Sequence, residues 1–230
     1  MDFTSFTPGS ALVTVMLIAL APFFAVMVTS FTKIVVVLSL LRSAMGLQQV
    51  PPNLVLNGLA LILSLYVMYP VLADMTEAAG YTVEAAGIEG EQIEDSNTIA
   101  GTGEIFAAAD RAKEPLRQFL IKHSTPGERA FFLRTQQRIS DPESAEELSE
   151  TDFIVIMPAF VVRELTIAFQ IGFLIFLPFL IIDMVISNIL LAMGMMMLSP
   201  VTISLPFKIL LFVLVDGWVK LAHGLVLSYV

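Results

Sequence analysis

Cysteine is absent from this chain of 230 residues, and histidine occurs only at positions 123 and 223. The lack of cysteine excludes disulfides, thiolate metal sites and a cysteine nucleophile. Two isolated histidines do not favour a histidine-built zinc site, so we expect no metal and no other cofactor. Basic residues are also scarce, with 12 Lys and Arg against 21 Asp and Glu. Because nucleic acid phosphates need basic partners, we expect no nucleic acid to bind.

Hydrophobic residues make up 57% of the chain and charged residues only 14%, and the mean hydropathy is +0.84. These values are typical of a membrane protein or a membrane assembly. No lysine or arginine precedes Lys33, so the N-terminus lacks the basic segment of a secretory signal. We therefore expect the first apolar run to remain part of the protein.

The acidic charge is concentrated in one part of the chain. Between Asp74 and Asp152 there are 17 acidic and 7 basic side chains, whereas the rest of the chain holds 4 and 5. Such a charge excess keeps an exposed domain soluble. The sequence thus predicts a hydrophobic helical hairpin over residues 1–73, an acidic soluble helical domain over 74–152 and a second hydrophobic hairpin over 153–230.

Turn signals support the first hairpin. An apolar run over residues 11–41 would measure about 46 Å as a helix, more than the ~30 Å hydrocarbon core requires. Residues 46–52 contain glycine and two prolines and predict a turn. A second run follows over 54–73, with Asn53 expected as its helix N-cap.

The acidic domain carries its own helix signals. Residues 80–103 are polar and rich in glycine, and we expect a flexible stretch there. Thr125 and Glu128 form a capping box around Pro126, which predicts a helix towards Ile139. A weaker capping pattern occurs over residues 144–147.

The second hairpin consists of apolar runs over 153–198, too long for one membrane span, and over 201–230. Charges inside such runs are costly in lipid and need partners, which favours an oligomer. Seven charged residues within or at the ends of the hydrophobic runs are expected to form ion pairs between subunits or within hairpins: Lys33, Arg42, Arg163, Glu164, Asp183, Lys208 and Asp216.

The tip of the second hairpin is rich in methionine. Four of the twelve methionines lie at Met193, Met195, Met196 and Met197, in a segment that we call the Met loop (Met193–Pro200). Methionine most often fills gaps in a hydrophobic segment, but its flexible and polarizable side chain can also seal around cargo of varying shape.

No catalytic motif is present, and we expect no enzymatic activity. Asp183 and Asp216 permit an intramembrane aspartyl protease as a hypothesis, although nothing around them indicates a substrate cleft. An ion-coupled secondary transporter is the better alternative, because such carriers use proline-interrupted helices with buried charge.

Several ordered motifs carry a family resemblance. They comprise Phe31–Leu38, Leu41–Asn53, Pro158–Leu165, Ala168–Leu174, Pro178–Asp183, Met195–Met197, Ile203–Lys208 and Leu211–Trp218. Together they closely resemble the FliP/SctR proteins, export-gate components of bacterial flagella and type III secretion injectisomes. The resemblance covers nearly the whole chain, except for the acidic stretch around residues 80–100.

The resemblance implies an all-α subunit with an extracytoplasmic acidic domain and both hairpin tips towards the cytoplasm. Five copies would form a ring with two companion membrane proteins, the FliQ/SctS and FliR/SctT types. Unfolded proteins would cross the bacterial inner membrane through this ring, with Met195, Met196 and Met197 as a gasket around the pore. The segments 50–54, 113–117 and 123–124 are more similar to the injectisome type.

Overall fold

The computed structural model describes residues 15–16, 19–20, 23, 26–80, 102–141, 148–195 and 197–230. Within these residues every regular element is an α-helix, which confirms the predicted all-α class. The helices are α2 (Phe31–Ala44), α3 (Asn53–Ala78), α4 (Thr102–Lys122), α5 (Pro126–Ile139), α7 (Phe153–Ala192), α8 (Pro200–Leu214) and α9 (Gly217–Leu227).

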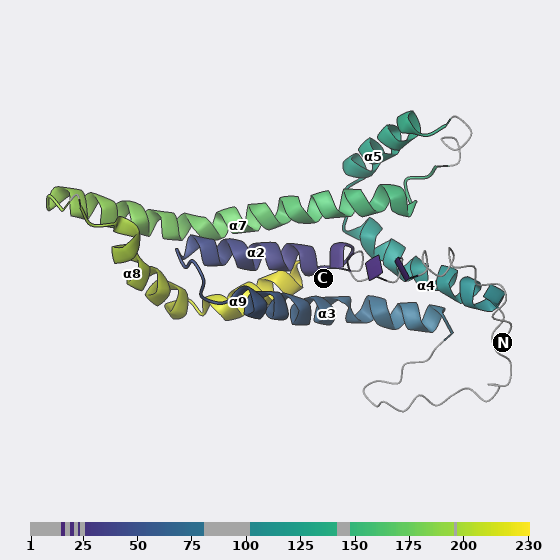
Figure 1. Ribbon diagram of the computed structural model, residues 1–230, viewed down its shortest axis with the longest axis horizontal. Coiled ribbons are helices and arrows are strands. Elements are labelled where there is room, and N and C mark those ends of the chain that lie inside the picture. The colour runs from purple at the N-terminus through teal and green to yellow at the C-terminus, as the bar shows by residue number, and fades with distance from the viewer. Residues whose placement is uncertain are drawn as a thin grey trace, which may run out of the picture.

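Helix α7 forms the long axis of an elongated molecule (Figure 1). Its 40 residues remain one continuous helix although they include Pro158 and Pro178. At 1.5 Å per residue α7 is about 60 Å long, twice the thickness of the hydrocarbon core. It is therefore too long for one span, as the sequence indicates, but it contains no turn.

Among the described residues, two helices, α3 and α7, are long and apolar enough to cross a membrane. Helices α8 and α9 pass the same test only as a pair, with a bend of 60° between them. The second arm of the C-terminal hairpin is thus broken at Val215 and Asp216, where the sequence shows one apolar run.

The first hairpin consists of α2 and α3, joined by the expected turn. Residues 28–30 form a further turn directly before α2. The expectation that Asn53 caps α3 is wrong, because the N-cap is Pro52 and Asn53 is the first helical residue. The Asn53 side-chain oxygen instead accepts a hydrogen bond from Arg42. This bond ties the end of α2 to the start of α3.

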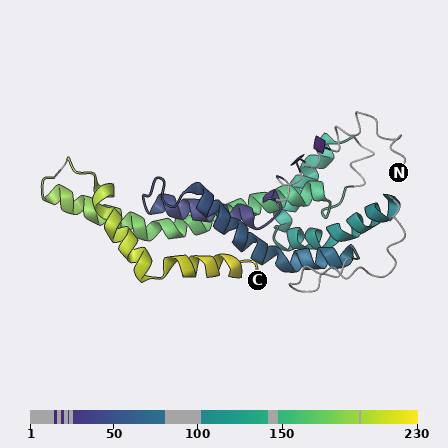
Figure 2. The same ribbon diagram turned by 60° about the horizontal axis from the view of Figure 1, so that its bottom comes forward.

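Helices of the acidic segment pack on the hydrophobic hairpins. Helix α4 lies beside the second half of α3, which continues past the apolar run to Ala78 (Figure 2). Helix α5 contacts α7, and its predicted capping box between Thr125 and Glu128 is confirmed, as is its end at Ile139. The weaker capping pattern over 144–147 and most of the stretch over 80–103 lie outside the described residues.

The buried core follows α2 from end to end. One cluster surrounds Ile34 and Leu38 and includes Ala168 of α7 and Leu225 of α9. Helices α2 and α7 approach closely, since a β-carbon added at Gly172 would lie 2.2 Å from Cδ1 of Leu40. Glycine at this position is what permits the close contact.

Candidate functional site

The Met loop lies at one extreme end of the molecule, where α7 and α8 meet (Figure 1). Helix α7 ends at a turn with Gly194 in a left-handed conformation, φ +73°, and α8 begins at Pro200 behind Ser199. Met193, Met195 and Met197 are 61%, 43% and 100% exposed, and Met196 lies outside the described residues. Three flexible thioether side chains therefore extend from the tip without being covered by the chain itself.

A buried ion pair joins the two arms behind this tip. The Lys208 ammonium donates to Oδ2 of Asp183 over 2.7 Å, and its side chain is 3% exposed. The Ser204 hydroxyl donates to the other carboxylate oxygen of Asp183 over 2.5 Å. Each oxygen of this partly buried carboxylate thus accepts a hydrogen bond from α8, one of them from the charged ammonium.

The same lysine also reaches the turn of the first hairpin. Its Nζ lies 3.4 Å from the backbone oxygen of Ala44, near the end of α2. A β-carbon added at Gly46 would lie 3.5 Å from Cγ1 of Val201, at the start of α8. The turn between α2 and α3 therefore contacts the start of α8, directly after the Met loop.

A second buried pair connects the two hairpins at a distance from the tip. Lys33 of α2 lies 3.5 Å from Oε2 of Glu164 in α7, and both side chains are 1% exposed. The Tyr229 hydroxyl donates to Glu164 and lies 3.4 Å from the Ser30 carbonyl oxygen. The Lys33 ammonium also lies 3.5 Å from the centre of the Tyr229 ring, a cation–π contact. Ion pairs between the two hairpins of one subunit were not among our sequence-based expectations.

The other three charged residues of the predicted set have no ion-pair partner among the described residues. Arg42 donates to Asn53 and to the Pro51 carbonyl oxygen. Arg163 is half-buried next to Glu164, and Asp216 is exposed at the break between α8 and α9. The structure thus brings together four of the seven residues, in two separate pairs.

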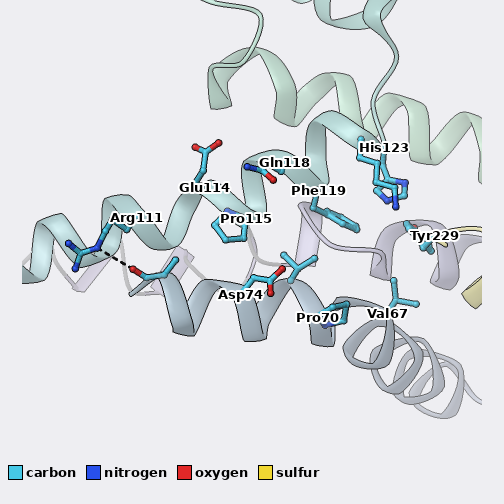
Figure 3. A pocket seen from close by; sticks show the side chains of 13 residues that line it. Val67, Pro70, Asp74, Arg111, Glu114, Pro115, Gln118, Phe119, His123 and Tyr229 are labelled. Atoms are coloured by element: carbon cyan, nitrogen blue, oxygen red, sulfur yellow. Dashed lines mark hydrogen bonds between the residues drawn. The ribbon is translucent and has the colours of Figure 1, made fainter. Parts of the chain in front are cut away.

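A third feature is a cavity of about 450 Å³ between α3 and α4, closed at one end by Tyr229 (Figure 3). The rings of Phe119 and Tyr229 stack 6.1 Å apart, and the His123 ring stands 5.1 Å from Tyr229. Burial lowers the pKa of His123 to about 4, and the nearby charges of Lys122 and Lys33 act in the same direction. Sequence reasoning missed this site, since nothing in the spacing of His123 and Tyr229 brings them together.

None of these sites has the composition of a catalytic or metal centre. Within the described ranges, no three His, Asp or Glu side chains lie together as ligands of a metal ion would. The arrangement instead offers an exposed, deformable tip on a hairpin that is held by buried ion pairs.

The fold and the site define a helical membrane protein built from two packed hairpins. A family model described as the FliP family matches residues 13–225. The chain therefore belongs to the FliP family, which confirms the resemblance seen in its motifs.

Relatives named for secretion, for translocation and for flagellar biosynthesis align over almost their whole length. The hypersensitivity response secretion protein HrcR of Ralstonia nicotianae is 47% identical over 96% of this chain and 97% of its own. The Yop proteins translocation protein R of Yersinia pestis is 49% identical over 93% and 92%. The flagellar biosynthetic protein FliP of Bacillus subtilis is 41% identical over 99% and 97%.

Proposed function

We propose that this chain is a core subunit of a type III secretion export gate, in which several copies surround a pore for unfolded proteins. The Met loop of each copy would close the pore between substrates. The observation that carries the proposal is the exposure of Met193, Met195 and Met197 at the end of a firmly held hairpin. Long, unbranched side chains can close a gap without a fixed shape and then give way to varied cargo.

The surface of α7 supports an assembled state. Phe169, Phe173, Leu174 and Ile181 are between 58% and 64% exposed along the helix that spans the molecule. Large contiguous apolar surfaces are covered by lipid or by other proteins. A ring of five copies with FliQ/SctS-type and FliR/SctT-type companions, as the family resemblance implies, would cover them.

The location follows from the same features. The apolar helices and the membership of the FliP family support a location in the bacterial inner membrane. We propose that the acidic segment over 74–152 lies on the periplasmic side and that both hairpin turns face the cytoplasm. The Met loop would then close the channel near its cytoplasmic entrance.

Among the branches of the family we favour the injectisome type. Identity is 47% and 49% to the secretion and translocation proteins named above and 41% to the flagellar one, although a harpin secretion protein of Pseudomonas syringae is only 40% identical. The names of these relatives describe secretion, translocation and flagellar biosynthesis, and none describes a solute carrier or a protease.

The position of the aspartates also disfavours a protease. Asp183 is paired with the ammonium of Lys208 and the hydroxyl of Ser204 rather than with a second carboxylate. Asp216 is exposed at a helix break. An aspartyl protease requires two carboxylates that share one proton.

The test replaces Met195, Met196 and Met197 with alanine in the complete secretion complex. We expect assembled complexes of unchanged mass that let ions and small solutes leak across the membrane. Met184→Ala is the matched control, because Met184 is 58% exposed on α7 but lies away from the loop. A triple variant that assembles and leaks no more than this control would refute the gasket.

A further inference from the structure

Two interruptions of helical hydrogen bonding, which we call breaks although α7 itself stays continuous, meet at the base of the hairpin that carries the Met loop. In α7, Pro178 has no N–H to donate to the carbonyl of Leu174, so the helix lacks one hydrogen bond there. In the opposite arm, α8 ends at Leu214, and the chain turns by 60° before α9. Both arms are therefore weakened at one level of the molecule.

The second break is conformationally strained. Asp216 has a φ of 54°, and it is the only residue other than glycine with a positive φ in the described part of the chain. Its side chain makes no capping hydrogen bond with α9. A left-handed conformation costs a residue with a side chain roughly 1–2 kcal/mol. Strain of this kind is often found where a chain must bend.

Both breaks face the same empty space. A cavity of about 400 Å³ is lined by Pro178 and Phe179 on one arm and by Phe212, Val215 and Gly217 on the other. The Phe212 ring packs edge-on against Trp218, with ring centres 5.4 Å apart. It also covers Gly217, where an added β-carbon would lie 2.2 Å from the ring. The Phe212 ring thus lies at the junction of α8 and α9, and it also lines the cavity.

Beyond the breaks, the hairpin is internally rigid. Residues 179–215, which we call the Met hairpin, contain the whole Asp183–Ser204–Lys208 network. This network joins α7 to α8 on the Met-loop side of the breaks, and α9 takes no part in it. Helix α9 is anchored separately, through buried Leu225 and through Tyr229 on Glu164.

We propose that the Met hairpin rocks as a rigid body about Pro178 and the Asp216–Gly217 break, and that this motion opens and closes the gate. The proposal rests on the gate function given above. In the present arrangement, the contact of Lys208 with the Ala44 carbonyl and the packing of Phe179 and Phe212 against α2 hold the hairpin in place. From Phe179 to Ala192 the arm measures about 21 Å, so a rotation of about 10° would move the tip by about 4 Å.

The test compares two proline substitutions in the complete complex. Pro178→Ala restores the missing helical hydrogen bond at the hinge and stiffens it. Pro158→Ala makes the same chemical change in the same helix, but far from the Met hairpin. We expect Pro178→Ala to slow secretion by about three- to tenfold with unchanged complex mass and ion leak, and Pro158→Ala to secrete as wild type.

Distances between spin labels provide a second measurement. The chain has no cysteine, so Leu191→Cys on the Met hairpin and Leu227→Cys at the far end of α9 can be labelled selectively, in copies diluted among unlabelled ones. Both positions are more than half exposed, at 54% and 67%. The channel is held open by a secreted protein of the host bacterium fused to green fluorescent protein, which resists unfolding and stalls. Leu227 lies ten residues, about 15 Å, from Gly217, so the rotation of about 10° changes the distance by up to about 3 Å. We expect this change with stalled cargo, and a constant distance in Pro178→Ala.

Equal secretion by the two proline variants, or an unchanged distance with stalled cargo, would overturn the hinge. The outcome is separable from that of the gate itself. If the triple methionine variant leaks but the distance is constant, the gate stands and the hinge fails. If the distance changes but that variant does not leak, the motion stands and the methionine seal fails.

Discussion

Lys208 of α8 forms an ion pair with Asp183 of α7 over 2.7 Å and also touches the Ala44 carbonyl at the end of α2. One side chain thus joins three helices directly behind the Met loop. Its ammonium is almost completely removed from solvent, whereas the Asp183 side chain keeps 26% of its exposure.

Replacing this lysine removes one partner of a buried pair. We expect Lys208→Ala to lower the free energy of unfolding by about 3 kcal/mol, because the Asp183 charge is left without its counterion. Lys220→Ala is the control, since Lys220 is exposed on α9 and has no ion pair among the described residues. Thermal unfolding in detergent measures both. The double variant Asp183→Asn/Lys208→Met should recover part of the loss, and equal stability of the two lysine variants would contradict the argument.

The close approach of α2 and α7 makes a second prediction. A methyl group at Gly172 would overlap with Leu40, so we expect Gly172→Ala to destabilise the fold by about 1–3 kcal/mol. At Gly58 nothing lies within 4 Å of an added β-carbon, and Gly58→Ala should stabilise α3 by up to about 1 kcal/mol. Unfolding of both variants in the same detergent gives the comparison. Adding Leu40→Ala to Gly172→Ala should restore stability, and its failure to do so would rule out this overlap as the cause.

The hydroxyl of Tyr229 gives a third prediction. It donates to Glu164, whose other contact is the ammonium of Lys33. Tyr229→Phe keeps the ring and its cation–π contact but removes this hydrogen bond, and we expect a loss of about 1–3 kcal/mol. Tyr69→Phe, on an exposed side chain of α3, should change stability very little. A similar effect of both changes on the unfolding temperature would show that the hydroxyl is unimportant.

A pH dependence follows from His123. Burial lowers its pKa to about 4 in the folded chain, against 6.5 in an unfolded one. Between these values only the unfolded chain binds the proton, so the free energy of unfolding decreases as the pH falls from 6.5 towards 4. The slope stays below about 1.4 kcal/mol per pH unit, because the half-buried ring is partly screened by water.

Replacing the His123 ring tests whether this residue causes the pH dependence of the unfolding free energy. His123→Phe should reduce the pH slope between 4 and 6.5, while His223→Phe on the exposed face of α9 should leave it unchanged. Unfolding curves at several pH values check this. An NMR titration of His123 with a midpoint near 6.5 in the folded chain would contradict the prediction.

Local and compositional signals predicted much of this fold. The capping box at Thr125 and Glu128 and the turn between α2 and α3 depend on residues that are adjacent in the sequence. Hydropathy alone separated the two hydrophobic hairpins from the acidic segment. These features depend on neighbours in the sequence, which is why they could be inferred from it.

Long-range contacts were beyond such reasoning. The Lys33–Glu164 pair joins residues 131 positions apart, and Tyr229 reaches the same carboxylate from the end of α9. The 60° break at Asp216 could not be predicted from the apolar run over 201–230, because hydropathy carries no information on backbone direction. Membership of the FliP family came from specific motifs rather than from composition.

The length of α7 has a consequence for the life of a newly made subunit. At about 60 Å, α7 is twice as long as the hydrocarbon core is thick, so a single copy that crossed the membrane upright would expose apolar side chains to water. An unassembled subunit would therefore be unstable, and we expect quality-control proteases to degrade it unless other subunits cover this surface quickly. In the proposed ring, the number of assembled gates would then be limited by the scarcest component, without a separate regulator of stoichiometry.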